Sequence, residues 1–200
     1  MNKIPEQYTG VAKDVEEQIQ LDDLFAANDI FLACRNRMLN INEWEHIASG
    51  ISASFHLTDR DGNAIQRLPA IGDHISINVP ASGSHDRYDW VVIEEIQEEQ
   101  SPDRTSESVS MQVRPCADPK DPGHDEVKHF FSDAATSTFL LSRVGKSITA
   151  GVYSRNEKPN VSSTENISET LRNTFVALGA MIGFSNIQWK SLVEGILDLH

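Results

Sequence analysis

The pattern of apolar and polar residues is clearest in the second half of the chain, where it predicts a β-hairpin. Phe139–Arg143 and Lys146–Tyr153 alternate apolar with polar residues, as strands with one buried face do. Val144–Gly145 stands between them as a two-residue turn. After a polar loop, Asn166 and Glu169 have the spacing of a capping box, which predicts the start of a long amphipathic helix. Its apolar stripe consists of Leu171, Phe175, Leu178 and Ile182.

Alternation of the same kind predicts four further strands upstream of the hairpin. They are expected over residues 51–58, 74–79, 88–96 and 108–114. The stretch 94–107, which joins the last two, is strongly acidic, and we expect it to be a solvated connector. Six strands that alternate in this way favour an antiparallel sheet with one buried face.

Helical periodicity precedes and follows these strands. Apolar pairs recur every seven residues between Leu21 and Asn40, and residues 42–50 predict a second, short helix. Near the C-terminus Gly183 interrupts the apolar stripe and a second capping-box spacing begins at Ser185, which predicts a kink or break. Because helices and strands are segregated along the chain, the expected class is α+β. The expected architecture is a curved antiparallel sheet of six, or seven, strands packed against a long, kinked C-terminal helix.

The chain is expected to form one domain with an N-terminal extension. Residues 1–20 are polar, acidic and poorly patterned, which predicts a flexible acidic arm. No internal repeat and no linker rich in proline, serine or glycine divides residues 21–200. We therefore expect a single α+β domain over residues 21–200.

Composition and charge limit the partners. The formal net charge of −13 repels nucleic acid and anionic membrane surfaces, so neither is expected as a partner. The longest apolar run, Phe175–Phe184, is far shorter than the roughly 20 residues that a membrane span needs. The N-terminus has no apolar core of a signal peptide, which favours a cytoplasmic protein. Cys34 and Cys116 are far apart and are expected to be free thiols.

The order of the predicted elements resembles that of the helix-grip superfamily of START-like and polyketide-cyclase-like proteins. The short helix around Trp44 is similar to the helix that opens the pocket in that superfamily, and the resemblance covers residues 21–199. The superfamily begins with a strand before its first helix, and here only Gln18–Gln20 could supply one. Three strings also resemble those of an uncharacterised bacterial protein family, namely residues 129–139, 155–160 and 187–190. The resemblance implies a fold and no mechanism.

No motif for a metal, a cofactor or covalent catalysis is present in the sequence. His124 and His129 lie five residues apart, which puts them on different faces of a helix or strand, so they are interpreted as solvated loop residues. There is no Gly-x-Ser-x-Gly elbow for a hydrolase serine, and Cys34 suits packing within an amphipathic helix. We therefore expect no metal ligand, no cofactor and no catalytic residue of these classes.

The predicted hairpin offers the best candidate for a ligand site. On its second strand Gly151, Tyr153 and Arg155 share one face, so the small glycine leaves room beside a ring and a cation. The simpler alternative is that Arg155 neutralises Glu157 or another acidic neighbour, and that Trp90 is a core aromatic. The candidate ligand-binding residues are Trp90, Arg114, His129, Tyr153, Arg155 and Glu157.

Three functions are compatible with these observations. The first, which we favour, is non-enzymatic binding of a small, partly apolar or amphipathic ligand between the sheet and the C-terminal helix. A sheet–helix space filled by side chains would contradict it. The second is a protein–protein interaction or scaffold module without a pocket, with a homodimer as one possible assembly. The third is a small-molecule hydrolase, cyclase or isomerase that uses His129, Arg155 or Glu157 as an acid/base group.

Overall fold

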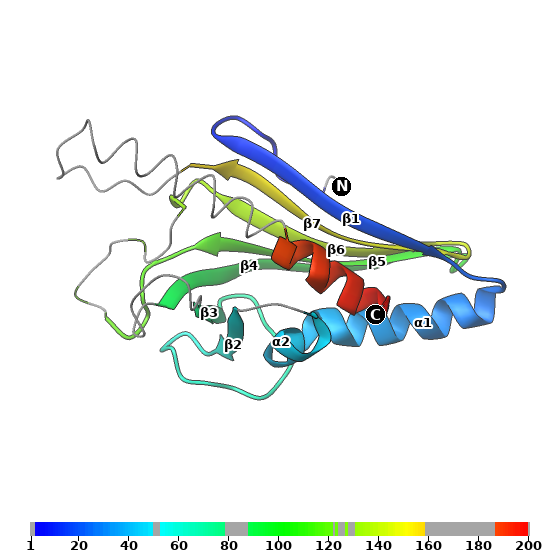
Figure 1. Ribbon diagram of the computed structural model, residues 1–200, viewed down its shortest axis with the longest axis horizontal. Helices are drawn as coiled ribbons and strands as arrows, with labels where there is room; N and C mark the ends of the chain where they lie inside the picture. The colour runs from blue at the N-terminus through cyan, green and yellow to red at the C-terminus, as the bar shows by residue number, and fades with distance from the viewer. Residues whose placement is uncertain are drawn as a thin grey trace.

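A seven-stranded antiparallel sheet forms the frame of the protein (Figure 1). The computed structural model describes residues 3–49, 53–78, 88–121, 123, 127, 131–158 and 187–199. The strands follow the order β1-β7-β6-β5-β4-β3-β2, so β1 and β2 are the two edges. They are β1 (Val11–Gln20), β2 (Ser54–Thr58), β3 (His74–Asn78), β4 (Tyr88–Gln100), β5 (Ser106–Pro115), β6 (Thr136–Val144) and β7 (Ser147–Glu157).

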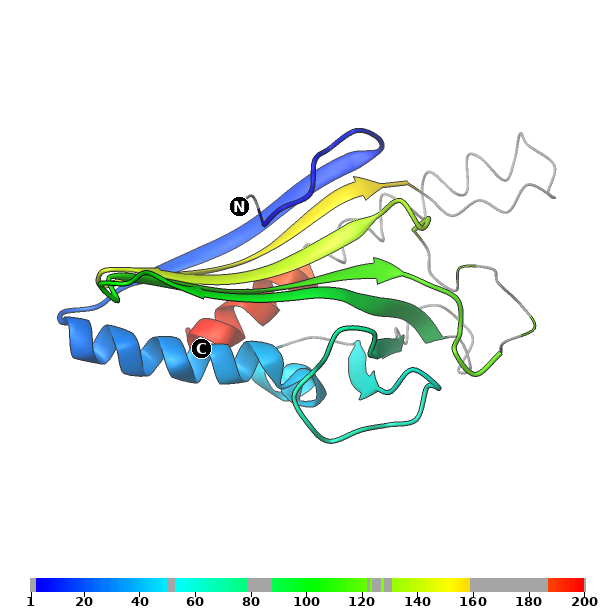
Figure 2. The same cartoon turned by 180° about the vertical axis from the view of Figure 1, so that it is seen from behind.

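The helices lie together on one face of this sheet (Figures 1 and 2). They are α1 (Leu24–Leu39), a 3₁₀ turn η1 (Ile41–Glu43), α2 (Trp44–Ile47) and the C-terminal helical segment 187–197. Helix α1 begins at Leu24 because Asp23 caps it, its Oδ1 accepting from the backbone N–H groups of Phe25 (2.8 Å) and Ala26 (2.9 Å). No helix in the described part of the chain is long and apolar enough to cross a bilayer.

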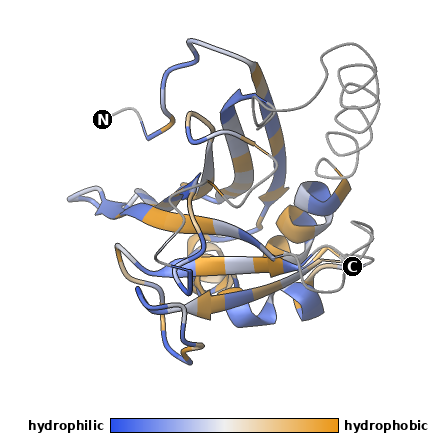
Figure 3. Cartoon of the chain, turned by 90° about the vertical axis from the view of Figure 1, so that its left-hand side faces the viewer, coloured by the Kyte–Doolittle hydropathy of each residue, from blue (hydrophilic) through white to orange (hydrophobic). Residues whose placement is uncertain are grey.

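Hydrophobic and hydrophilic residues change places along the strands (Figure 3). Because successive side chains point to opposite sides, this gives the sheet two chemically different faces. We call the face that the helices cover the inner face and the opposite one the outer face. One inner row shows the pattern, because the register places Met111, Phe139, Val152 and Val15 side by side on four neighbouring strands. The first three of these are buried in the core, and Val15 packs against it.

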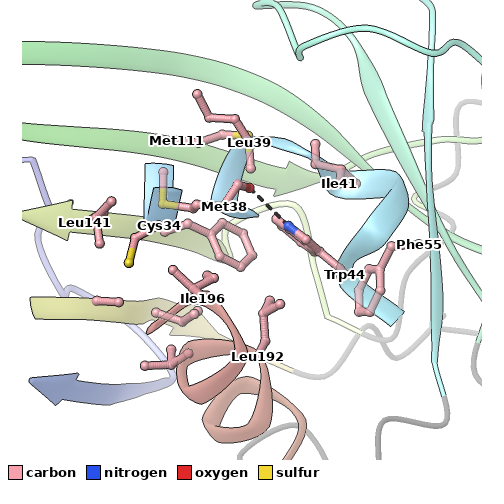
Figure 4. Packing of buried hydrophobic residues seen from close by; sticks show 14 of the residues in the cluster. Cys34, Met38, Leu39, Ile41, Trp44, Phe55, Met111, Leu141, Leu192 and Ile196 are labelled. Atoms are coloured by element: carbon pink, nitrogen blue, oxygen red, sulfur yellow. Dashed lines mark hydrogen bonds between the residues drawn. The ribbon is translucent and has the colours of Figure 1, made fainter. Parts of the chain in front are cut away.

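Aromatic side chains fill the space between this row and the helices. The ring of Trp44 lies 4.8 Å from that of Phe139 and 5.4 Å from that of Phe55. Trp189 of the C-terminal helical segment meets Phe139 edge-on at 5.5 Å. The Trp44 Nε1–H donates to the backbone oxygen of Met38 (3.0 Å), so the buried indole is satisfied (Figure 4). From Leu192 onward the helix therefore packs directly on the sheet.

The structure confirms the α+β class and the antiparallel sheet, with seven strands, the larger of the two expected numbers. The predicted hairpin is present, but its turn is Gly145–Lys146, because Val144 still pairs with Ser147. The acidic stretch 94–107 is mostly strand, since Glu94–Gln100 belongs to β4 and only residues 101–105 connect it to β5. Its side chains are exposed or half-buried, with Glu98–Gln100 exposed in succession, which is how so acidic a sequence can remain in a sheet.

The expected arm and the expected terminal helix differ from the structure. Val11–Gln20 of the arm form β1, a sheet strand paired along its length with β7, and this strand supplies the element that the helix-grip layout lacked. Residues 159–186 are outside the described part, and with them the cap at Asn166 and the break near Gly183. The described C-terminal helix is short, over residues 187–197, and a long, kinked helix is not confirmed. Both cysteines are free, as expected.

We expect Leu192→Ala to lower the free energy of unfolding by about 2–5 kcal/mol, because the fully buried side chain would leave a cavity between helix and sheet. Ile187→Ala in the same helical segment is the matched control, since its side chain is 70% exposed. It should change stability by no more than about 0.5 kcal/mol. Urea unfolding followed by circular dichroism measures both, and equal effects would contradict the packing described here.

Candidate functional site

A small group of polar side chains interrupts the apolar inner face next to the Phe139 row. The register places Ser137 of β6 opposite Ser154 of β7, and Ser154 opposite Lys13 of β1. The two serine Oγ atoms are 3.4 Å apart. Glu157, at the end of β7, completes the group, with its Oε2 3.3 Å from Lys13 Nζ. We call these four residues, Lys13, Ser137, Ser154 and Glu157, the inner polar cluster.

Glu157 is the unusual member of the inner polar cluster. Its side chain is only 4% exposed, and that of Lys13 only 13%. Although Lys13 is close enough to form an ion pair, Glu157 Oε2 is buried and accepts no hydrogen bond within the described part of the chain. Burial raises the pKa of this carboxyl, and the charge of Lys13 and the hydroxyl of Ser154 only partly oppose that effect. The Lys13 ammonium compensates part of the cost of burying this oxygen, and a bound donor group would add a hydrogen bond of better geometry.

A surface groove shares Lys13 with the inner polar cluster. It runs along the edge strand β1 beside the C-terminal helical segment and has a volume of about 480 Å³. Lys190 stands on its helical side, with Nζ 3.9 Å from a carboxylate oxygen of Glu17 and 3.7 Å from one of Glu194. Its lining consists of Lys13, Asp14, Val15, Glu16, Glu17 and Lys190. Lys13 belongs to both the groove and the inner polar cluster, and therefore connects them.

A second hollow, of about 470 Å³, lies at the opposite end of the sheet, between the β4–β5 and β6–β7 turns. Its charged centre is the buried pair in which Arg143 Nε donates to Glu107 (2.6 Å). The same guanidinium donates to the backbone oxygens of Gly145 (2.9 Å) and Arg104 (3.0 Å). Since its donors are engaged in fastening the two turns together, we assign this pair a structural role.

Two of the residues predicted from the hairpin face away from the helices. Tyr153 and Arg155 share one face, as predicted, but it is the outer one, because they alternate with the inner residues Val152 and Ser154. The Tyr153 hydroxyl donates to Glu16 (2.8 Å), and Arg155 forms an ion pair with Asp14. The expectation that these two side chains open space for a ligand under the helix therefore differs from the structure.

Gly151 has a different role from the one predicted. A Cβ atom at this position would lie 2.9 Å from the ring of Tyr153, so the absent side chain makes room for that ring on the outer face. The pKa of Tyr153 is raised well above its ordinary value, first through burial and then through the hydrogen bond to Glu16.

Trp90 and Arg114 also lie on the outer face. Trp90 alternates with the core residues Val91 and Ile93, and its side chain is buried there as the alternative interpretation expected. Arg114 Nε donates to Glu94 (2.6 Å) and its Nη1 to the backbone oxygen of Asp133 (2.7 Å). His129 is outside the described residues. Of the candidates that the structure describes, Glu157 alone belongs to the inner polar cluster.

Lys13, Ser137 and Ser154 were not among the residues predicted from the sequence. Lys13 was assigned to a flexible arm, although the inward positions Val15 and Ile19 that follow it were a signal for a strand. The serines were taken as ordinary polar positions of alternating strands. In the described part of the chain no three side chains of histidine, cysteine, aspartate or glutamate are grouped so that they could hold a metal ion.

Comparisons with known proteins return structural likenesses alone. No protein-family model and no curated protein sequence matches the chain. Among solved structures, TTHA0849 from Thermus thermophilus is similar at 10% identity and a TM-score of 0.45, with 94% of this chain and 99% of that chain covered. The Zhui aromatase/cyclase from Streptomyces has 6% identity, a TM-score of 0.45 and coverages of 94% and 93%.

Norcoclaurine synthase from Thalictrum flavum is similar at 12% identity and a TM-score of 0.38, with 94% of this chain and 86% of that chain covered. Likenesses at these values say nothing about what the present chain binds. The element order expected from the helix-grip resemblance is seen in the chain itself. It runs as a strand, the helices α1 and α2, six strands and a C-terminal helical segment.

The raised pKa of Glu157 predicts how stability depends on pH. Because the folded state holds this proton more tightly than the unfolded chain, stability is lost as pH rises from about 4.3, the ordinary glutamate value, through the raised value. Glu157→Gln removes this dependence. Urea unfolding between about pH 4.5 and about pH 7.5 should show a flatter slope for the variant than for the wild type. Glu157→Gln also removes the ion pair with Lys13, which lowers the free energy of unfolding at every pH. The test is therefore the slope of that free energy against pH, and parallel curves for the two proteins would contradict the raised pKa of Glu157.

Proposed function

We propose that the protein binds a small, partly apolar ligand in the groove between β1 and the C-terminal helical segment, with a polar group of the ligand directed at the inner polar cluster. The observation that carries this proposal is the buried Glu157 Oε2, which accepts no hydrogen bond among the described residues and stands beside Lys13. A protein gains nothing for its fold from an acceptor left in this state. A ligand that donates a hydrogen bond would satisfy this oxygen.

The two charges of the pair define the polar group of the ligand. Glu157 can accept from an N–H or O–H group, and Lys13 can donate to an oxygen or to the lone pair of a neutral nitrogen on the same or a neighbouring atom. A hydroxyl, an amide or a neutral amine meets these conditions. A fully anionic ligand does not, because Asp14, Glu16 and Glu17 line the approach.

The apolar part of the ligand is expected to lie along Val15, toward the core. Val15 lines the groove and packs against the core, next to Val152 in the register. Further along the helix Leu192, Val193 and Ile196 are fully buried against the sheet, so the ligand is placed beside that contact and not beneath it. The space between sheet and helix, where the ligand was expected from the sequence, is filled by Trp44, Phe139 and Trp189, which contradicts that placement. The groove beside it is proposed instead.

The first experiment is native mass spectrometry of the protein purified from its own host, followed by denaturation and extraction of bound molecules. The proposal expects a stoichiometric small molecule that carries a hydrogen-bond donor on an apolar body. A bare protein that also fails to enhance the fluorescence of 1-aminoanthracene, an apolar amine probe, would contradict it. The same spectra report whether the chain is a monomer or a dimer.

Glu157→Gln and Lys13→Met should each weaken binding of 1-aminoanthracene roughly tenfold or more, because a hydrogen bond to a charged group contributes about 1.5–3 kcal/mol. Arg155→Ala and Tyr153→Phe are the matched controls, since both side chains lie on the outer face of the same strand. Fluorescence titration measures all four. If Arg155→Ala and Tyr153→Phe weaken binding while Glu157→Gln and Lys13→Met leave the affinity unchanged, the site lies on the outer face.

A second function, acid/base catalysis on a small molecule, is favoured by one observation. Burial raises the pKa of Glu157, and a carboxyl with a raised pKa is a better proton acceptor than an ordinary glutamate and can return the proton as an acid. Arg155 is held on the outer face by Asp14 and is not proposed for this role. If the molecule extracted from the protein changes in mass or in chromatographic retention on incubation with the wild type and not with Glu157→Gln, the protein is an enzyme. An unchanged mass and retention in both leaves binding as the function.

A further inference from the structure

Glu157 faces the inner side of the sheet because β7 contains an extra residue. Along β7 the side chain of Ser154 points inward and that of Arg155 outward, so strict alternation would turn Glu157 outward as well. The register with β1 shows the irregularity. Lys13 pairs with Ser154 and Val11 pairs with Glu157, so a step of two residues on β1 lies opposite a step of three residues on β7. This is a β-bulge, which re-aims the side chain that follows it.

Asn156 forms the bulge. Its backbone has φ 58°, in the left-handed region that asparagine tolerates better than most residues other than glycine. The residue is only 1% exposed although its side chain is polar. Such a combination persists where the surroundings hold the backbone in place.

The surroundings of Asn156 are the N-terminal segment, by which we mean residues 6–10. The Oδ1 atom of Asn156 accepts from the backbone N–H groups of Tyr8 (2.9 Å) and Thr9 (3.1 Å). Its Nδ2 donates to the backbone oxygen of Glu6 (3.1 Å), and its own backbone N–H donates to Gln7 Oε1 (2.8 Å). Four consecutive residues, nearly 150 positions away in the sequence, therefore bind one asparagine.

The contact continues from Asn156 to Glu157 itself. Gly10 has φ 62°, and a Cβ atom there would overlap the backbone oxygen of Glu157. Only glycine fits a position that combines this conformation with so close an approach. The N-terminal segment and the end of β7 are thus fitted to one another on both sides of the bulge.

We propose that Asn156 is a positioning residue for the ligand site. By binding Asn156, the N-terminal segment holds Glu157 beside Lys13. When residues 6–9 are bound to Asn156, the bulge is fixed and Glu157 lies in the inner polar cluster. When they are released, β7 can return to regular alternation, which turns Glu157 to the outer face and removes the acceptor from the site. The effect of this contact on ligand binding rests on the proposed function, whereas its effect on the position of Glu157 does not.

The test compares two ways of breaking the same contact. Asn156→Gly keeps the left-handed backbone accessible and removes the side chain that binds residues 6, 8 and 9, and deletion of residues 2–9 leaves Asn156 intact. Leu57→Ala, a buried residue on the far edge strand β2, is the control for a general loss of stability. The readout is the titration of the Glu157 carboxyl carbon by NMR, assigned by its absence from Glu157→Gln.

The groups that act on Glu157 among the described residues are Lys13 of β1 and Ser154 of its own strand. The wild type and Leu57→Ala should titrate alike, with the raised pKa that burial gives. Asn156→Gly and the deletion should both titrate near the ordinary glutamate value and should agree with each other. If either of them is folded and titrates like the wild type, the proposal is overturned.

Binding of 1-aminoanthracene separates this inference from the proposed function. If both hold, Asn156→Gly and the deletion weaken binding by the same factor as Glu157→Gln, roughly tenfold or more. A wild-type protein that does not bind the probe, but whose Glu157 titration responds to both changes, supports the positioning role and removes the proposed ligand. Full probe affinity in a variant whose carboxyl titration has moved contradicts the link between the two.

Discussion

The structure depends on one constraint, which is that each strand of the sheet must keep one face under the helices. Phe139, Val152 and Met111 meet this constraint by standing in one row, and Trp44 and Trp189 cover that row from the helical side. With the middle of this face so apolar, a shift of one residue in any strand would exchange core and surface side chains. The register is consequently well determined, and a polar group on the inner face requires an explanation.

The inner polar cluster has a cost that the fold does not need. Ser137 and Ser154 occupy regular inward positions, but Glu157 reaches the inner face only through the bulge at Asn156. Replacing a buried ion pair by apolar residues often leaves stability unchanged or raises it. A chain selected only for stability would end β7 in regular alternation. The bulge, its dedicated N-terminal segment and the carboxylate oxygen that accepts no hydrogen bond among the described residues are better understood as parts of a site.

The sequence was informative wherever alternation was regular and misleading where it was broken. The hairpin of β6 and β7, and the shared face of Tyr153 and Arg155, follow from period-two alternation and are present in the structure. Which of the two faces the helices cover did not follow, because small and polar residues stand on both. Strand β1 was missed because Lys13 and Glu17 occupy two of its inward positions, which hides its apolar side. A bulge that depends on contacts between residues 6–9 and 156 leaves no local signal.

Edge-strand protection is the main alternative explanation for charge on the inner face. Sheets often place inward-pointing charges on an edge strand, where they discourage pairing with another chain. This accounts for Lys13 and Glu17, since β1 is an edge and Lys190 lies across the groove from it. It does not account for Glu157, because β7 lies between β1 and β6 and has no free edge to protect. Protective charges also need water around them, whereas the Glu157 side chain is 4% exposed. Lys13 can serve both purposes, but edge protection leaves the buried carboxylate beside it unexplained, and a ligand site explains it.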